Sequence, residues 1–289
     1  DEDPNEGLAV DYDYTQTAPL AESFFPQSLS RNELHQRIIE MESIALDDSS
    51  ITNSEGAFGQ VSYSLLGQLN SRGLEHYVGQ SYYSHGIQVV ASTPRGVSQV
   101  DGSYSGALCW SKLDDPNFSA KLAQKRVKAK LHPRSIPSGV YPVVFTPHAS
   151  DHLIKALMNG LSGRAQYKKT SFVQDALSQT LLPNWCSLTH QPLLEGAHYS
   201  YPLDANGLIA KHRSIIEEGK VLEYILSLYS ARRLGLKPNH LAGGVKNLAM
   251  TTNALNFDEV VSKFPRCIVV DDVMGTGVNL VNGDYSMGI

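Results

Sequence analysis

The sequence predicts an α+β fold of two domains, in which antiparallel sheets carry packed helices. Residues 57–111 alternate apolar and polar side chains and are interrupted by Gly, Pro, Asn and Asp, as in an antiparallel sheet of hairpin-linked strands. Helical periodicity occurs before and after this stretch. Because these strands follow one another directly and do not alternate with helices, a doubly wound parallel sheet is disfavoured.

We expect the first domain to span residues 1–135. Ser30-Arg31-Asn32-Glu33 has the pattern of a capping box, which predicts a helix from about residue 31. Turns in the sheet are expected at residues 70–73, 94–96 and 101–102. A second helix is predicted after Pro116, with one apolar face and one face rich in Lys and Arg, which we interpret as a solvated surface.

The second domain is expected over residues 136–289, beyond a proline-rich linker at 132–139. A strand is predicted at residues 141–145, followed by a helix whose wide apolar face should be buried. That face carries Leu153, Ile154, Leu157, Met158 and Leu161. Further on, residues 208–217 and 221–228 are predicted to form a hairpin that turns at Glu218-Gly219.

Composition excludes several classes of protein. The 289 residues are 42% hydrophobic and 18% charged with a net charge of -5, which is typical of a globular chain without the basic excess that nucleic-acid binding needs. No apolar run is long enough for a membrane span. The three scattered cysteines predict a reducing compartment. The chain begins with Asp1, and we expect it to be an internal segment of a longer protein.

Two segments could carry chemistry of their own. His148 and His152 are spaced as zinc ligands can be, but no Glu adjoins His148 to activate a metal-bound water, so capping and surface roles are favoured. Residues 268–277 combine an apolar strand, Asp271-Asp272 and a Gly/Thr loop, which resembles the ribose-phosphate loop of phosphoribosyltransferases. That activity stays an alternative, although it requires a parallel sheet that the sequence does not predict.

Five separated segments together resemble the TldD/PmbA family, and within it the PmbA (TldE) branch. They are, in chain order, Tyr167-Lys168-Lys169-Thr170-Ser171-Phe172, Leu182-Pro183-Asn184-Trp185, residues 229–236, Ala242-Gly243-Gly244, and residues 274–279 followed by 283–286. A weaker likeness reaches back through residues 51–56. The resemblance implies an α+β domain followed by a domain rich in antiparallel strands.

The resemblance also implies a cytoplasmic heteromeric protease, formed with a TldD-type partner and acting on unfolded or extended peptides. The TldD branch carries His-Glu-x-x-x-His on a buried helix and binds zinc. Alignment on Gly160-Leu161-Ser162-Gly163 puts Ile154, Lys155 and Asn159 at those positions, where they replace both ligands and the general base. We therefore expect no catalytic residue, metal or cofactor in this chain, and zinc in the partner.

On this interpretation the chain holds peptide or contacts its partner through polar loop residues, without direct contact to nucleic acid or membrane. The candidates are Tyr167, Lys168, Lys169, Arg232, Asn279, Asp284 and Tyr285. Local roles such as turn formation stay open for each of them. Met287 stands where the family usually has Arg, and Asp271-Asp272 replaces a Thr-Glu-like pair. A homodimeric peptidase without zinc is the second alternative.

Overall fold

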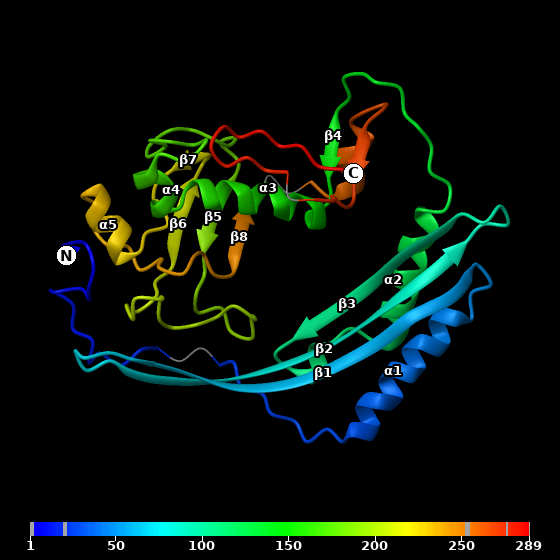
Figure 1. Ribbon diagram of the computed structural model, residues 1–289, viewed down its shortest axis with the longest axis horizontal. Coiled ribbons are helices and arrows are strands. Elements are labelled where there is room, and N and C mark those ends of the chain that lie inside the picture. The colour runs from blue at the N-terminus through cyan, green and yellow to red at the C-terminus, as the bar shows by residue number, and fades with distance from the viewer. Residues whose placement is uncertain (1–2, 20–21, 252–254, 276, 289) are drawn as a thin grey trace.

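The computed structural model describes residues 3–19, 22–251, 255–275 and 277–288. Its lower layer in Figure 1 is a long antiparallel sheet of β1 (Ile51–Leu69), β2 (Glu75–Ser92) and β3 (Ser98–Ala107), with β2 in the middle. The predicted meander is thereby confirmed, as are its turns at residues 70–73 and 94–96.

The turn predicted at Asp101-Gly102 was wrong, because both residues lie inside β3 and Gly102 pairs with Gln88 of β2. A Cβ atom at Gly102 would lie 2.3 Å from the carbonyl oxygen of Ile87. Glycine at this position therefore permits a close approach of two strands and does not reverse the chain.

Two helices, α1 (Arg31–Leu46) and α2 (Pro116–Ala129), cover one face of the sheet (Figure 1). The capping box predicted at the start of α1 is confirmed, since Ser30 Oγ accepts from the Glu33 N–H and the Glu33 carboxylate accepts from the Ser30 N–H. The short 3-10 helix η1 (Trp110–Lys112) precedes α2. The buried core between helices and sheet contains Met41, Ala45, Ile51, Ile87, Val89, Ala91, Ala120, Ala123, Val127 and Leu131.

The upper part of the molecule contains a second antiparallel sheet in the order β7-β6-β5-β8. Its strands are β5 (Ser187–His190), β6 (Arg213–Glu217), β7 (Lys220–Val221) and β8 (Leu248–Thr251), and the helices beside it are α4 (Gly163–Lys168) and α5 (Leu228–Leu234). The predicted hairpin turns at Glu218-Gly219, but its strands are shorter than expected. Leu188, Ile215, Ile216 and Leu241 are fully buried in the core here.

A small parallel sheet stands beside this part of the fold. It pairs β4 (Val143–Phe145) with β9 (Ile268–Val270), and the short helix α6 (Phe257–Ser262) precedes β9. The predicted strand at residues 141–145 is therefore confirmed over its second half. The long helix α3 (Pro147–Gly160) follows β4 and runs along the upper sheet (Figure 1).

The burial predicted for the apolar face of α3 was wrong in part. Leu161, just beyond the helix, is fully buried, but Leu153, Ile154, Leu157 and Met158 are only half-buried. Within the helix itself, the buried residues are Ala149, Ala156 and Gly160. Helical periodicity identifies an apolar face but not what that face contacts. Here Ile154 and Met158 border a cavity, whereas Leu157 packs against the core of the upper part.

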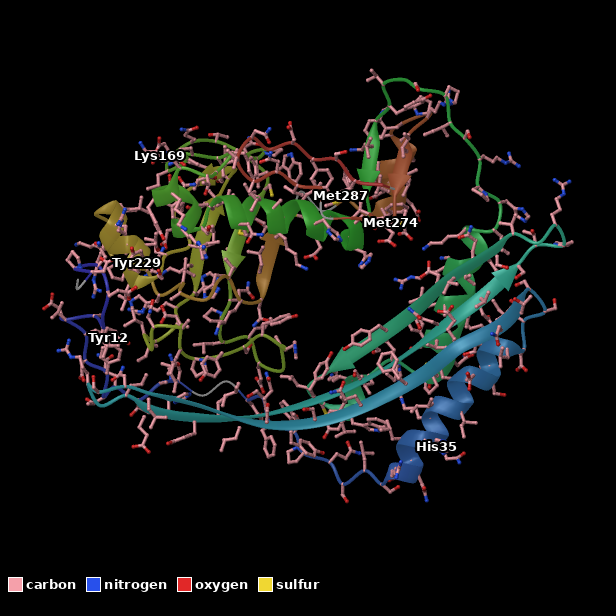
Figure 2. The ribbon with its side chains drawn as sticks, viewed as in Figure 1. Tyr12, His35, Lys169, Tyr229, Met274 and Met287 are labelled. Carbon is pink, nitrogen blue, oxygen red and sulfur yellow. The ribbon has the colours of Figure 1, made fainter. Side chains whose placement is uncertain are left out.

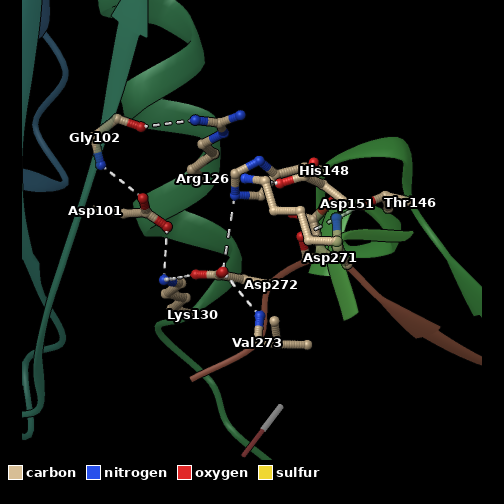
Figure 3. A network of polar contacts seen from close by, with 12 residues as sticks. Asp101, Gly102, Arg126, Lys130, Thr146, His148, Asp151, Asp271, Asp272 and Val273 are labelled. Atoms are coloured by element: carbon tan, nitrogen blue, oxygen red, sulfur yellow. Dashed lines mark hydrogen bonds and ion pairs between the residues drawn. The ribbon is translucent and has the colours of Figure 1, made fainter. Parts of the chain in front are cut away.

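The two layers meet at both ends of the sheet. At one end, Tyr14 and Ala18 of the N-terminal segment pack with Leu74 of the lower layer and with Leu203 and Leu208 of the upper part. At the other end, Lys130 Nζ lies 2.8 Å from the carboxylate of Asp101 and 4.0 Å from that of Asp272 (Figure 3). The chain that joins α2 to β4 has no regular structure, and the predicted domain boundary at residues 135/136 stays a prediction.

Candidate functional site

A cavity of about 920 Å³ lies between α3 and the upper sheet, and we call it the α3 cavity. Ile154, Lys155, Met158 and Asn159 line it from the helix. The opposite wall includes Ile225, Leu241, the loop at residues 242–245, and Leu248 at the start of β8. The volume and the mostly apolar lining with a few polar groups are typical of a binding site.

The three positions that resemble the zinc motif therefore lie together on the wall of this cavity. Ile154 contributes an alkyl side chain and Asn159 an exposed amide. The Lys155 ammonium lies 2.5 Å from the Asp151 carboxylate, one helical turn away, so this cation is already paired. Arg164 also lines the cavity and has no ion-pair partner within the described residues.

These side chains do not fit a zinc ion. An alkyl group cannot ligate zinc, an amide is a weak ligand for it, and an ammonium next to the cation would repel it. Nowhere in the described part of the chain do three or more His, Cys, Asp or Glu side chains gather as a metal site would need. No catalytic step through a metal follows from these residues.

Backbone groups beside the cavity remain available for hydrogen bonding. β8 is an edge strand, paired only with β5 within the described residues, and Leu248 of β8 faces the α3 cavity. In the adjoining loop, Gly243 and Gly244 adopt positive φ values of 84° and 100°, which glycine tolerates best. Within the described residues, the N–H groups of Gly243 and Val245 donate no hydrogen bond.

The described residues of the C-terminal segment, 274–275 and 277–288, fold back on one another as an irregular hairpin. Asn279 N–H donates to the Asp284 carbonyl at 2.8 Å, and Asn279 Oδ1 accepts from Val281 N–H at 2.9 Å. The Asp284 carboxylate accepts from the Asn282 amide at 2.6 Å. Asn279 therefore orders the turn through a side-chain bond to the backbone, whereas Asp284 does so through another side chain.

This hairpin lies against α3. A smaller cavity of about 270 Å³ is lined by Lys155 and Asn159 of α3 and by Gly275, Leu280 and Met287 of the hairpin. Leu280 also accepts a backbone hydrogen bond from Phe172 at 2.7 Å. Figure 2 shows Met274 and Met287 at the β4 end of α3. Asn159 thus faces both cavities and joins the hairpin to the α3 cavity.

The remaining predicted site residues lie in three different places. The hydroxyl of Tyr285 is buried without a hydrogen-bond partner in the described part of the chain. Tyr167 packs edge-on against Tyr229 and beneath the Arg233 guanidinium. Lys168 and Lys169 are exposed at the end of α4. Figure 2 shows Lys169 away from Met287.

Arg232 is engaged by the N-terminal segment. Its guanidinium donates to the carbonyl oxygens of Asn5, Glu6, Gly7 and Leu8 at 2.7–3.0 Å. Tyr229 of the same helix donates to Asp3. Figure 2 shows Tyr229 and Tyr12 at the end of the molecule where this segment runs. In this structure Arg232 therefore fastens the N-terminal segment to α5, and its role toward peptide or partner stays a prediction.

The pair Asp271-Asp272 faces a separate cavity of about 480 Å³ between the two layers. Asp272 lies 3.9 Å from His148 Nε2 and 4.0 Å from Lys130, so its carboxylate joins the layers (Figure 3). His148 is an exposed residue in the first turn of α3, as favoured from the sequence. Within the described residues, β9 pairs only with β4 in a two-stranded sheet, which is not the doubly wound sheet of a phosphoribosyltransferase.

Sequence reasoning missed several residues that line the α3 cavity, among them Tyr199, Asn247 and Leu248. Tyr199 lies in an irregular loop without periodicity, and only the folded chain brings that loop beside α3. Gly243 and Gly244 belong to one of the five segments that carry the family resemblance, but that resemblance does not indicate that they line a cavity. Two adjacent glycines before a short strand were the one feature that could have indicated this wall of the site.

Comparison with known proteins assigns the chain to a class. A family model described as the PmbA/TldA metallopeptidase C-terminal domain matches residues 138–289. The chain belongs to the PmbA/TldD family, as its motifs predicted. Its fold class, α+β with antiparallel sheets, is shared by solved structures described as modulators of DNA gyrase.

Two curated relatives are named as metalloproteases. The chain is 30% identical over 287 residues to metalloprotease PmbA of Escherichia coli O157:H7, and the matched region covers 99% of this chain and 64% of the relative. It is 29% identical to a PmbA homolog of Haemophilus influenzae, over 94% of this chain and 60% of that protein. The chain thus spans less than two thirds of these relatives, whose names imply a metal for the family.

Three solved structures share the fold. A protein described as a modulator of DNA gyrase from Bacteroides thetaiotaomicron has a TM-score of 0.92 at 24% identity, covering all of this chain and 66% of its own. One from Thermotoga maritima has a TM-score of 0.87 at 20% identity, with coverage of 98% and 67%. TldE from Thermococcus kodakarensis has a TM-score of 0.69 at 16% identity, with coverage of 92% and 64%.

Proposed function

We propose that this chain is the non-catalytic, peptide-holding subunit of a cytoplasmic peptidase whose zinc is bound by a TldD-type partner. The observation that carries the proposal is the position of Ile154, Lys155 and Asn159. They form one wall of a cavity of about 920 Å³ while offering no zinc ligand set. A helix that lines a cavity but carries no zinc ligands is suited to binding a peptide and not to metal catalysis.

The proposed substrate is an unfolded or extended peptide. A peptide in β conformation can pair with the free edge of β8, and such backbone pairing tolerates many sequences. Ile154, Met158 and Leu248 would then contact apolar side chains of the peptide, and the exposed Asn159 amide would contact its backbone. Among the described residues, no helix is both long and apolar enough to cross a membrane.

The test is to purify the full-length protein alone and together with a TldD-type partner, and to measure zinc content and hydrolysis of an unstructured peptide in each sample. We expect the isolated chain to hold no stoichiometric zinc and to cleave nothing, while the pair does both. Changing the general-base Glu of the partner to Gln is the control, and it should abolish hydrolysis while this chain is unaltered.

Two results would overturn the proposal. Tightly held zinc in the isolated chain would show that Ile154, Lys155 and Asn159 are not the relevant positions. Metal-free hydrolysis by the isolated chain would instead support a homodimeric peptidase without zinc.

A further inference from the structure

A second cavity of about 670 Å³ adjoins the α3 cavity, and we call it the sheet-side cavity. It is lined from below by Leu66, Gly67 and Gln68 of β1 and by Gln80 of β2, and from above by the loop at residues 198–205. Tyr199, Ala242, Gly243 and Val245 line both cavities. The two cavities therefore adjoin along these four residues, one on the side of α3 and the other on the side of the long sheet.

Tyr199 stands where the two cavities meet, and its side chain is 67% exposed. Its neighbour His198 holds the loop in place, because the His198 carbonyl accepts from Gln80 Nε2 at 3.1 Å and its ring lies 4.6 Å from that of Tyr82. The Tyr199 ring in turn packs edge-on against His198 at 4.7 Å. The loop is therefore anchored, while most of the Tyr199 ring and its hydroxyl are left free within the described residues.

The charged groups around the sheet-side cavity already have hydrogen-bond or cation–π partners within the protein. Lys246 Nζ donates to the Leu203 carbonyl and lies over the Tyr201 ring at 4.6 Å. The Asp204 carboxylate accepts from three backbone N–H groups, those of Asn206, Leu208 and Ala242. The lining thus offers an occupant side-chain amides, aromatic rings and the N–H groups of Gly243 and Val245, which donate no hydrogen bond within the described residues. Both charged side chains of the lining, Lys246 and Asp204, are already hydrogen-bonded to the backbone.

We infer that the sheet-side cavity is a second subsite for the same extended peptide, and that Tyr199 is the residue over which the peptide passes between the cavities. This inference rests on the proposed function. Peptide carbonyls accept from the N–H groups of Gly243 and Val245, and a peptide side chain packs on the Tyr199 ring. Neutral peptide segments match this lining better than acidic or basic ones, because burying an unpaired charge is costly.

The test compares unstructured peptides of about five and about twelve residues, which span about 17 and 40 Å when extended. Equilibrium binding and hydrolysis are measured with the full-length protein assembled with a TldD-type partner. Tyr199→Ala should weaken binding and raise KM about fivefold for the long peptide, with little change for the short one. Tyr199→Phe should behave as wild type. Tyr77→Ala is the matched control, since Tyr77 is an exposed residue of β2 outside both cavities.

The outcomes separate the two proposals. If Tyr199→Ala handles both peptides as the wild type does, or weakens both equally, the second subsite is refuted and the proposed function stands. If the wild-type pair binds the long peptide through Tyr199 but does not cleave it, the peptidase role fails and the subsite stands. If the wild type binds neither peptide, both fail.

Discussion

Helices α2 and α3 begin alike and lie in different surroundings. Each has Pro in its first turn after a capping side chain, Asp115 for α2 and Thr146 for α3. α2 buries six of its residues against the lower layer, namely Pro116, Ser119, Ala120, Ala123, Gln124 and Val127. α3 buries Ala149, Ala156 and Gly160, while its half-buried Ile154 and Met158 line a cavity.

On the proposed function, the difference separates apolar surface used for folding from apolar surface used for binding. In α2, even the polar Gln124 is used for packing, because its amide donates to the carbonyls of Ile44 and Ala45 at 2.9 and 3.0 Å. In α3, Ile154 and Met158 contribute apolar surface to a cavity wall. Partly exposed apolar side chains gathered along a cavity are typical of binding sites.

Replacing one buried and one half-buried methionine with alanine should give the largest difference in the free energy of unfolding. Met41 of α1 is fully buried in the core shared with α2, so Met41→Ala should lower the free energy of unfolding by about 2–5 kcal/mol. Met158 of α3 is half-buried, and Met158→Ala should cost about 1 kcal/mol. Urea denaturation at pH 7.5 measures both. Equal losses would mean that the α3 face is a core face after all.

Two buried histidines, one in each layer, extend the comparison to the pH dependence of stability. In the lower layer, both ring nitrogens of His85 have partners, Arg37 Nε and Ser119 Oγ. In the upper sheet, His190 Nδ1 accepts from Lys246 N–H, while Nε2 is buried without a partner in the described residues. Burial, and then the nearby positive charge of Lys246, lowers the pKa of His190 to about 4.

Since the folded state disfavours protonated His190, stability should be fully present above the unfolded pKa of about 6.5 and lost as the pH falls toward 4. The loss from this residue should reach up to about 3 kcal/mol. Denaturation of the wild type and His190→Gln at pH 7.5 and 4.5 measures it. The variant should lose distinctly less stability between the two pH values, and identical losses would contradict a neutral buried His190.

Substitutions in the C-terminal hairpin should change the activity of the assembled pair. Asn279 orders the turn that lies against α3, so Asn279→Ala should lower kcat/KM of the assembled pair about tenfold without removing zinc from the partner. Tyr285→Ala should act in the same direction. Full activity in both variants would remove this hairpin from the site.

Asp272→Asn should have the smallest effect. Its exposed carboxylate accepts from the Val273 N–H at 2.8 Å, a bond that the Asn carbonyl oxygen can also accept. Its contacts to Lys130 and His148 are long, and exposed ion pairs contribute about 0–1 kcal/mol. We expect an unchanged kcat/KM and a marginal change in the urea midpoint. Binding of phosphoribosyl pyrophosphate by the wild type, abolished in Asp272→Asn, would instead favour the phosphoribosyltransferase alternative.

Local patterns in the sequence predicted much of the fold. The capping box at Ser30, the start of α2 and the turn at Glu218-Gly219 are short-range features whose residues act within a few positions of one another. The turn predicted at Asp101-Gly102 was wrong because glycine also occurs where two strands approach closely. That role depends on the neighbouring strand and not on the local sequence.

The candidate site was predictable only where a motif marked it. Ile154, Lys155 and Asn159 were found through the family resemblance, by alignment of its zinc motif on residues 160–163. The engagement of Arg232 by the carbonyls of residues 5–8 joins segments more than 220 positions apart, and nothing local indicates it. Tyr199 reaches the cavity because His198 anchors its loop to β2, which is likewise a long-range contact.

The central claim is that the α3 cavity holds the peptide that a partner's zinc cleaves. The most direct measurement is kcat/KM of the assembled pair carrying Met158→Trp, which fills the cavity, beside Phe118→Trp on the exposed face of α2. We predict a fall of at least about tenfold for Met158→Trp, with the zinc content of the pair unchanged and with Phe118→Trp equal to wild type. Undiminished hydrolysis by a folded Met158→Trp protein would contradict the claim.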